Sequence, residues 1–233
     1  FNPKAYSKLS FLISGSIAST LREENVDTNR LDSFEPTFVS RNEQKKYTAN
    51  WTLNYKVNTK HKLRIGVNYD SYDFDIIDSV LLSNGTWFDE LEFEGNAALI
   101  RGFAQWKFKL TEKLSIVSGI NYQTFTLNNS TSFEPRAGIN YIISKKVLLG
   151  GAYGRHSQLQ PLPIYFSKDL RATERENKMN EELDFTRSDH FVLSLNYFPT
   201  NNLSFKIETY YQKLSSIAED PENKDFTILN FGF

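Results

Sequence analysis

The sequence predicts an all-β protein, in the form of an antiparallel, up-and-down transmembrane β-barrel with about ten strands in this chain. Two observations support this prediction. Apolar and polar side chains alternate with a period of two along most of the chain, and short turns alternate with long polar segments between the alternating stretches. We expect each alternating stretch to be a strand with one apolar face and one polar face.

Residues 46–57, which read KYTANWTLNYKV, show the alternation most clearly. One face would carry Tyr47, Ala49, Trp51, Leu53, Tyr55 and Val57, and the other would carry Thr48, Asn50, Thr52, Asn54 and Lys56. A helix would scatter the aromatic side chains around its whole circumference. The segment is therefore predicted to be a strand.

Similar patterns predict the other strands. They cover residues 7–17, 62–70, 98–110, 114–124, 133–143, 147–156, 189–198, 203–212 and 226–233. Many of these stretches approach the roughly 9–11 residues of a tilted membrane strand. Strands of ordinary globular proteins average about five or six residues. The lengths therefore favour a membrane barrel over a soluble β-sandwich, which also alternates and remains an alternative.

The connections between the predicted strands fall into two classes. Short turns are expected at residues 58–61, 111–113, 144–146 and 199–202. Long polar loops are expected at about 19–45, 71–96, 157–187 and 213–225, with a shorter one near 125–132. Short turns on one side and long loops on the other are typical of outer-membrane barrels.

Composition narrows the classes of function. The 27 basic and 28 acidic side chains balance, which argues against a nucleic-acid-binding protein. The absence of cysteine excludes disulfides and thiolate metal sites. No apolar stretch approaches the roughly 18 residues of a spanning helix, and the first residues do not form a signal peptide. We expect no cofactor and no metal site.

Two short motifs carry a resemblance to a known family. Glu134, Pro135 and Arg136 open one predicted strand, and one hairpin later the chain reads Tyr-Gly-Arg-His-Ser-Gln at residues 153–158. This order resembles the barrel of TonB-dependent outer-membrane receptors. The segment 191–221, with its Tyr-Tyr-Gln strand end, is similar to the next hairpin of that family.

The resemblance implies active uptake of a scarce nutrient, such as a siderophore, cobalamin or a glycan, across the bacterial outer membrane. Such receptors have a 22-stranded barrel and an N-terminal plug domain. Residues 1–233 would then form a partial barrel domain that lacks the plug and the remaining strands. The implied partners are outer-membrane lipid, the rest of the barrel, the plug, the TonB energy-transducing complex and a small-molecule or glycan ligand. A surface lipoprotein is a further candidate partner.

Candidate ligand-binding residues lie where the strand 147–156 meets the long loop. They are Arg155, His156, Gln158, Tyr165 and Phe166. Alternatively, Arg155 and His156 anchor the loop, and the apolar residues of the loop pack against one another.

A second set of residues is predicted to face the barrel lumen. It comprises Arg64, Asp70, Arg101, Lys107, Glu134, Arg136, Lys206 and Glu208. We expect these charges to pair across neighbouring strands and to keep the lumen polar.

The alternative function is a complete ten-stranded outer-membrane barrel that acts as a surface protease, another hydrolase or an adhesin. Asp189 and His190 are adjacent, but neighbouring strand residues face opposite sides, so Asp189 cannot orient His190 within one strand. No nucleophile elbow or zinc-protease motif is present. We expect a non-enzymatic protein without catalytic residues. Pairing of residues 7–17 with 226–233 would instead mark a closed small barrel.

Overall fold

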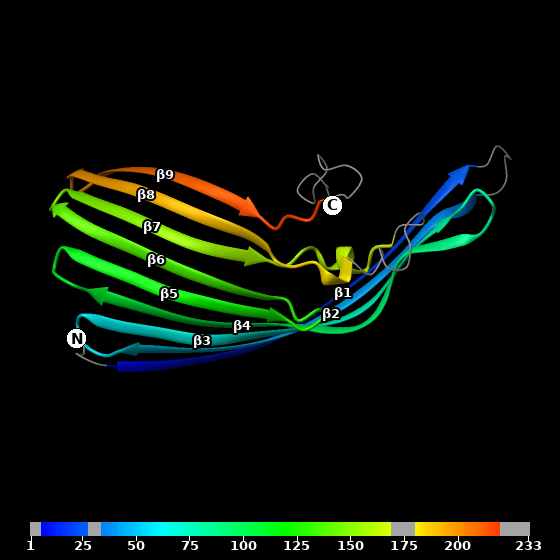
Figure 1. Ribbon diagram of the computed structural model, residues 1–233, viewed down its shortest axis with the longest axis horizontal. Coiled ribbons are helices and arrows are strands. Elements are labelled where there is room, and N and C mark those ends of the chain that lie inside the picture. Colours follow the sequence, from blue (N-terminus) through cyan, green and yellow to red (C-terminus); the bar gives the residue numbers. More distant parts are fainter. Residues whose placement is uncertain (1–5, 28–33, 169–179, 220–233) are drawn as a thin grey trace.

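The computed structural model describes residues 6–27, 34–168 and 180–219. Within these ranges, nine antiparallel strands form one sheet. They follow one another in the sheet in the order of the sequence (Figure 1). They are β1 (Tyr6–Asp27), β2 (Phe34–Lys56), β3 (His61–Leu81), β4 (Trp87–Lys109), β5 (Leu114–Phe125), β6 (Thr131–Ser144), β7 (Val147–Gln158), β8 (Thr186–Thr200) and β9 (Leu203–Ser215). The predicted fold class is confirmed. In the described ranges, no helix is long and apolar enough to cross a membrane.

The four predicted short turns are confirmed, and they gather at one end of the sheet (Figure 1, left). At the turn after β2, the Asn58 side chain accepts hydrogen bonds from the backbone N–H groups of Lys60 and His61. At the turn after β4, the Thr111 hydroxyl accepts from Lys113 and Leu114 in the same way. Local side-chain bonds of this kind stabilise tight turns.

One face of the sheet carries two rows of exposed aromatic side chains. The row nearer the short turns consists of Tyr55, Trp106, Tyr141, Tyr197 and Phe205, and the other row consists of Tyr47, Tyr69, Tyr122, Phe133, Phe191 and Tyr211. Apolar side chains lie between the rows. Along β2, from Tyr47 to Tyr55, the rows are about 27 Å apart at roughly 3.4 Å per residue. This arrangement matches the apolar band and aromatic girdles of a membrane barrel. We call this face the outer face and the opposite one the inner face.

Beyond the second aromatic row, β1–β4 continue as a long extension that β5–β9 lack, as Figure 1 shows. The loops predicted at 19–45 and 71–96 are therefore largely wrong, since β3 and β4 are joined only by residues 82–86. In β3 and β4 the extension still alternates, but in the opposite phase. Its outer face carries Arg41, Glu43, Lys45, Asp73, Asp75, Glu92 and Glu94, and its inner face carries Phe74, Ile76, Leu91 and Phe93.

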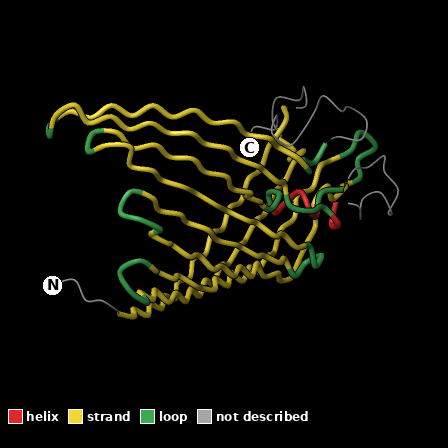
Figure 2. The backbone as a smooth tube through the Cα atoms, turned by 60° about the vertical axis from the view of Figure 1, so that its left-hand side comes forward, coloured by secondary structure: helices red, strands yellow, loops and turns green. Residues whose placement is uncertain are grey.

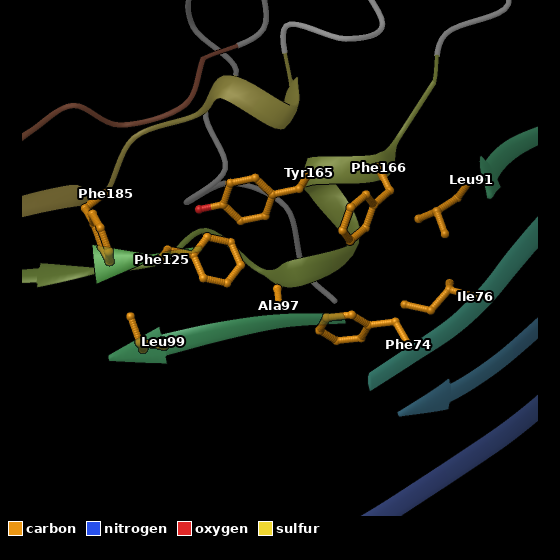
Figure 3. Close-up of a cluster of buried hydrophobic side chains, with 9 residues drawn as sticks. All are labelled: Phe74, Ile76, Leu91, Ala97, Leu99, Phe125, Tyr165, Phe166 and Phe185. Atoms are coloured by element: carbon orange, nitrogen blue, oxygen red, sulfur yellow. The ribbon is translucent and has the colours of Figure 1, made fainter. Parts of the chain in front are cut away.

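The predicted loop at 157–187 is confirmed as a connection outside the strands. It contains two short 3₁₀ helices, η1 (Leu162–Phe166) and η2 (Asn180–Glu182). Its described residues, 159–168 and 180–185, form what we call the arm. The arm folds over the inner face of β3–β5, where it forms a buried apolar cluster (Figure 3). The cluster is thus built from both the strands and the arm. We call the part of the sheet between the short turns and the second aromatic row the wall.

Within the described residues the sheet is open and curved, as the tube in Figure 2 shows. There β1 pairs with β2 and β9 pairs with β8, so each end strand has one neighbour. The predicted tenth strand at 226–233 lies outside the described residues, and its pairing with 7–17 therefore stays untested. An unpaired strand edge is not tolerated in lipid, because its backbone groups would have no hydrogen-bond partners.

Candidate functional site

The inner face of the wall holds a polar network centred on the buried carboxylate of Asp70. Asp70 is 1% exposed and accepts a hydrogen bond of 2.6 Å from the Thr48 hydroxyl. The Arg101 guanidinium pairs with the same carboxylate and donates to the Asn68 side chain at 2.8 Å. Lys46 lies 3.6 Å from Asp70. Thus β2, β3 and β4 are connected by one carboxylate, and the predicted pairing of Asp70 and Arg101 across strands is confirmed.

A second network surrounds Glu134. Its buried carboxylate accepts hydrogen bonds from Gln123 at 2.9 Å and from Arg136 at 2.7 Å. It also accepts from the backbone N–H of Ser157 at 2.9 Å. The β6–β7 ladder ends at Arg136, next to Pro135, which has no backbone N–H to donate. Glu134 therefore replaces a missing ladder bond, and the two sequence motifs meet at this point.

The other predicted ion pairs differ from expectation. Arg136 pairs with Glu134, and Lys206 pairs with Glu208 at 2.8 Å, but in both cases the partners lie two residues apart on one strand. The prediction of pairing across neighbouring strands is wrong for these residues. Side chains two apart share a face of a strand and can reach one another without a neighbouring strand.

The side chains at the end of β7 point alternately to the outer and the inner face. Arg155 lies on the outer face, where its guanidinium donates to Asp189 at 3.0 Å, and Tyr153 donates to the same carboxylate at 2.7 Å. His156 lies on the inner face, edge-on to His190 at a ring distance of 5.0 Å. His190 is 2.7 Å from the Ser188 hydroxyl. Asp189 and His190 therefore face opposite sides, as predicted.

Tyr165 and Phe166 do not face a ligand in this structure. They are 0% and 5% exposed, and Phe166 stacks on Phe93 of β4 at 3.6 Å. Tyr165 packs at a tilt against Phe125 with the ring centres 5.4 Å apart. The prediction that these two rings contact ligand is corrected: they are buried in the arm's own contact with the wall (Figure 3), because apolar surface on the extension needs cover. The alternative, that the loop packs on itself, covers only part of their contacts, because the rings pack mainly on β4 and β5.

The hydroxyl of Tyr165 is buried close to the backbone of Gln160 but makes no well-formed hydrogen bond among the described residues. Burial raises the pKa of Tyr165 to about 12, because the charged phenolate would lose its hydration. The neutral form is therefore strongly favoured while the arm is docked.

Polar side chains that the sequence did not single out hold the arm at its base. The Gln160 amide donates to the Thr186 hydroxyl at 2.8 Å and to the Asp184 carbonyl at 3.1 Å. The Asn128 amide donates to the carbonyl oxygens of Glu181 and Leu183. An amide in a polar loop has no distinguishing pattern in the sequence, so these contacts could not be predicted.

Three depressions lie on the inner face, with volumes of about 610, 310 and 280 Å³, and we call the first the larger and the last the smaller depression. The larger one, of about 610 Å³, is lined by Arg64, Arg136, His156 and His190 and has Gly119, Gly138 and Gly154 in its wall. Of the five predicted ligand contacts, His156 lies in this depression, and Gln158 is exposed at the end of β7. The smaller depression lies near the short turns and has a volume of about 280 Å³.

Solved structures share this fold at low sequence identity. The copper transporter OprC superposes with a TM-score of 0.60 at 10% identity, covering 90% of this chain and 35% of that chain. The ferric-catecholate import receptor Fiu from E. coli K12 gives 0.54 at 10% identity, covering 91% and 33%. The RagAB peptide transporter gives 0.52 at 15% identity, covering 90% and 28%. The chain thus spans about a third of the length of these structures.

No curated protein sequence gives a significant match. Residues 6–230 match the family described as TonB dependent receptor-like, beta-barrel. That match covers nearly the whole chain and agrees with the antiparallel wall, the two aromatic rows and the open edges described above. The chain therefore belongs to the TonB-dependent receptor β-barrel family.

Proposed function

We propose that this chain forms part of the barrel wall, with one extracellular arm, of an outer-membrane receptor that imports a scarce nutrient with energy from the TonB complex. The observation that carries the proposal is the wall itself. Its outer face is an apolar band between two aromatic rows, its inner face is polar, and its end strands β1 and β9 each have one neighbour among the described residues. Such a wall is stable in a membrane only when further strands complete it.

In this function the chain performs no covalent chemistry. The outer side chains bind lipid, while Asp70 and Glu134 link neighbouring strands on the polar inner face. The remaining strands and a plug domain lie in other parts of the protein. His156 and Gln158, on accessible positions near the base of the arm, are our proposed ligand contacts. Arg155 is not among them, because it points to the outer face and pairs with Asp189.

The ligand class follows from the family resemblance: a siderophore, cobalamin or a glycan. The similar structures include proteins described as ferric-catecholate, copper and peptide transporters, a range that shows how little the shared fold restricts the cargo. Among the described residues, His190 contacts Ser188 and His156 and no carboxylate, which argues against an enzymatic role.

Uptake measurements in whole cells test this proposal. Cells that produce the full-length receptor are given labelled ferric siderophores, cobalamin and oligosaccharides, with and without a functional TonB complex. We expect accumulation of one ligand that stops when the complex is removed. Equal accumulation in both strains would indicate a passive pore, and absence of the protein from the outer-membrane fraction would contradict the proposal directly.

The His156→Ala variant sharpens the test, with Arg155→Ala as its matched control on the other face of the same strand. A reduced affinity for the imported ligand in the first variant alone would support the assigned contact. Equal affinities in both variants and the parent would show that His156 does not contribute to ligand binding.

A further inference from the structure

Three of the four short turns carry exposed lysines. They are Lys60 in the turn after β2, Lys113 in the turn after β4, and Lys145 and Lys146 in the turn after β6. We call these four side chains the basic rim. The turn after β8 consists of Asn201 and Asn202 and carries no charge. The basic rim therefore follows one end of the sheet from β2 to β7 (Figure 1, left).

The same backbone hydrogen bonds fix one lysine in each of these three turns. A side chain two residues earlier accepts from the lysine N–H: Asn58 for Lys60 at 2.8 Å, Thr111 for Lys113 at 3.1 Å and Ser144 for Lys146 at 3.2 Å. The lysine carbonyl oxygen accepts from a backbone N–H in the first strand of the next hairpin, at 2.8 or 2.9 Å in all three turns. The backbone of each lysine is thus held in an equivalent way, and the ammonium group is left for a partner.

Acidic side chains are scarce at this end of the sheet. The connecting residues 57–60, 110–113, 145–146 and 201–202 contain one of them, Glu112. In the part of the chain that the structure describes, no lysine of the basic rim forms an ion pair. Arg64 and Lys107, on the inner face close to the rim, form none there either, so the prediction that these two residues pair across strands is not met.

The aromatic row nearer the short turns sets the depth of the basic rim in a bilayer. Lys145 follows Tyr141 of this row by four residues, and Lys113 precedes Leu114, which pairs with Tyr141. Four residues at about 3.4 Å each, on a strand tilted by about 45°, rise roughly 10 Å along the membrane normal. The headgroup layer is roughly 5–8 Å thick on each side of the hydrocarbon core. Lysine side chains that bend back towards the row therefore place their ammonium groups in this layer.

We propose that the basic rim binds the phosphate groups of anionic phospholipids in the membrane leaflet on the side of the short turns. The proposal rests on the proposed function, because it requires a wall that crosses a bilayer. Neighbouring basic turns are two strand spacings apart, roughly 10 Å. One phosphate group cannot contact two turns at that distance, so the rim would hold several lipid molecules side by side.

The surface beside the lysines favours a lipid over an acidic polypeptide. Next to Lys60, the rings of His61, Trp106 and Phe108 stack on the outer face with their centres 4.6–5.6 Å apart. This aromatic surface continues into the apolar band between the two rows. A phospholipid carries an anionic phosphate next to its acyl chains and therefore matches the lysines and the band together. An acidic polypeptide would match the lysines alone.

Spin-labelled lipids in phosphatidylcholine bilayers that contain the full-length receptor test the proposal. The electron paramagnetic resonance spectrum separates lipid at the protein surface from free lipid, so it gives the relative association of labelled phosphatidylglycerol and labelled phosphatidylcholine. One lysine near the headgroups favours an anionic lipid roughly fivefold. We expect an overall preference of roughly threefold for phosphatidylglycerol, because lipids elsewhere around the wall do not discriminate. The preference should shrink in 1 M salt, which screens charges beyond about 3 Å.

Replacing the lysines of the basic rim separates their charge from other causes of lipid binding. The combined variant Lys60→Gln, Lys113→Gln, Lys145→Gln and Lys146→Gln should lose the preference, and arginine at the same four positions should preserve it. These variants should fold like the parent, because the turns are fixed through backbone groups of the lysines. Asn201→Lys with Asn202→Lys extends the rim to the fourth turn and should increase the preference.

Two results would overturn the proposal. One is a glutamine variant that keeps the preference of the parent for phosphatidylglycerol. The other is a parent without any preference, and carbodiimide cross-links from its rim lysines to carboxylates of another protein would then assign the basic rim to an acidic protein partner.

These outcomes are separable from those of the uptake test. A preference for phosphatidylglycerol in a receptor that imports nothing would leave the basic rim in place and refute the transport function. TonB-dependent uptake by a receptor without this preference would refute the lipid site alone.

Discussion

The extension continues four strands of the membrane-level wall, β1–β4, yet in β3 and β4 the two regions place their apolar side chains on opposite faces. Between the two aromatic rows, Trp51 and Leu53 of β2 lie on the outer face. Farther along, Phe74 and Ile76 of β3 are buried on the inner face, and Asp73 and Asp75 take the outer one. The phase of the alternation changes close to Tyr69, within one continuous strand.

The difference shows that the surroundings, rather than the backbone, decide which face is apolar. In the wall, the outer face meets lipid and the inner face meets a polar lumen. In the extension, the outer face meets water and the inner face is covered by the arm. In β3 and β4 the pattern is therefore inverted from one region to the other, while the backbone ladder runs on without a break through the change of phase.

The largest effect is expected from Phe166→Ala, which removes the ring that joins the arm to the extension. Truncation of a buried phenylalanine costs about 3–5 kcal/mol. We expect the arm to detach locally, so that protease cleaves it much faster while the wall stays folded. Cleavage rates of the parent and the variant measure this effect. An unchanged rate would mean that the polar bonds at the base hold the arm without the cluster.

The second largest effect is expected when a charge is placed on the outer face, where its cost should differ between the wall and the extension. Leu193→Arg, between the aromatic rows of β8, should cost about 2–4 kcal/mol because the cation enters lipid. The matched variant Ile77→Arg, on the outer face of the extension, should cost less than about 0.5 kcal/mol because that face is wet. Unfolding of the full-length receptor in denaturant measures both. Similar losses of unfolding free energy in the two variants would indicate that the extension also lies in the membrane, and would contradict the difference between the two regions.

The effect of removing a carboxylate on stability should also differ between the wall and the extension. Asp70→Asn removes the charge from the buried network of the wall and should cost about 2 kcal/mol, since Arg101 then loses its partner. Glu43→Gln acts on an exposed pair of the extension, where the Lys45 ammonium lowers the pKa of Glu43. That stabilisation is present above the usual glutamate pKa and is lost as the pH falls through the lowered value. We expect no detectable change for Glu43→Gln at neutral pH, and thermal unfolding scans compare the two variants.

The smallest effect is expected from Tyr165→Phe, which removes a buried hydroxyl without a good partner. Docking of the arm should be unchanged or up to about 1 kcal/mol tighter at neutral pH. The folded pKa of about 12 lies above the usual value near 10, so the docked arm is fully stable below pH 10 and weakens as the pH rises from 10 to 12. Protease sensitivity at pH 9, 10 and 11 should rise in the parent and stay flat in the variant. A rise of the same size in both would assign the pH effect to another group.

Much of the wall could be predicted from sequence. The alternation at 46–57 identified the strand and its two faces, and Asn58 and Thr111 mark two of the four short turns. Average polarity predicts a loop instead of the extension, because SYDFDI at 71–76 is polar overall, although it alternates as regularly as the wall. Attention to a change of phase, rather than to average polarity, would have found it.

The candidate site was less predictable. Pairing of Asp70 with Arg101 could be anticipated, because both lie on polar faces of adjacent strands. The role of Glu134 as a substitute for a missing ladder bond could not, since it depends on where Ser157 of β7 comes to lie. The juxtaposition of Lys56, Lys62 and Lys107 is likewise invisible in the sequence, because these lysines become neighbours only through the strand register.

By itself, the sequence determined the strands of the wall, the short turns, the apolar outer face and the family resemblance, because these follow from residue order within single strands and hairpins. Which charges meet, which face the extension buries and where the arm docks are properties of the tertiary structure alone. Those properties depend on register between strands and on contacts between segments far apart in the chain, such as Phe93 with Phe166. A periodic pattern specifies a surface, but it does not specify what will cover that surface.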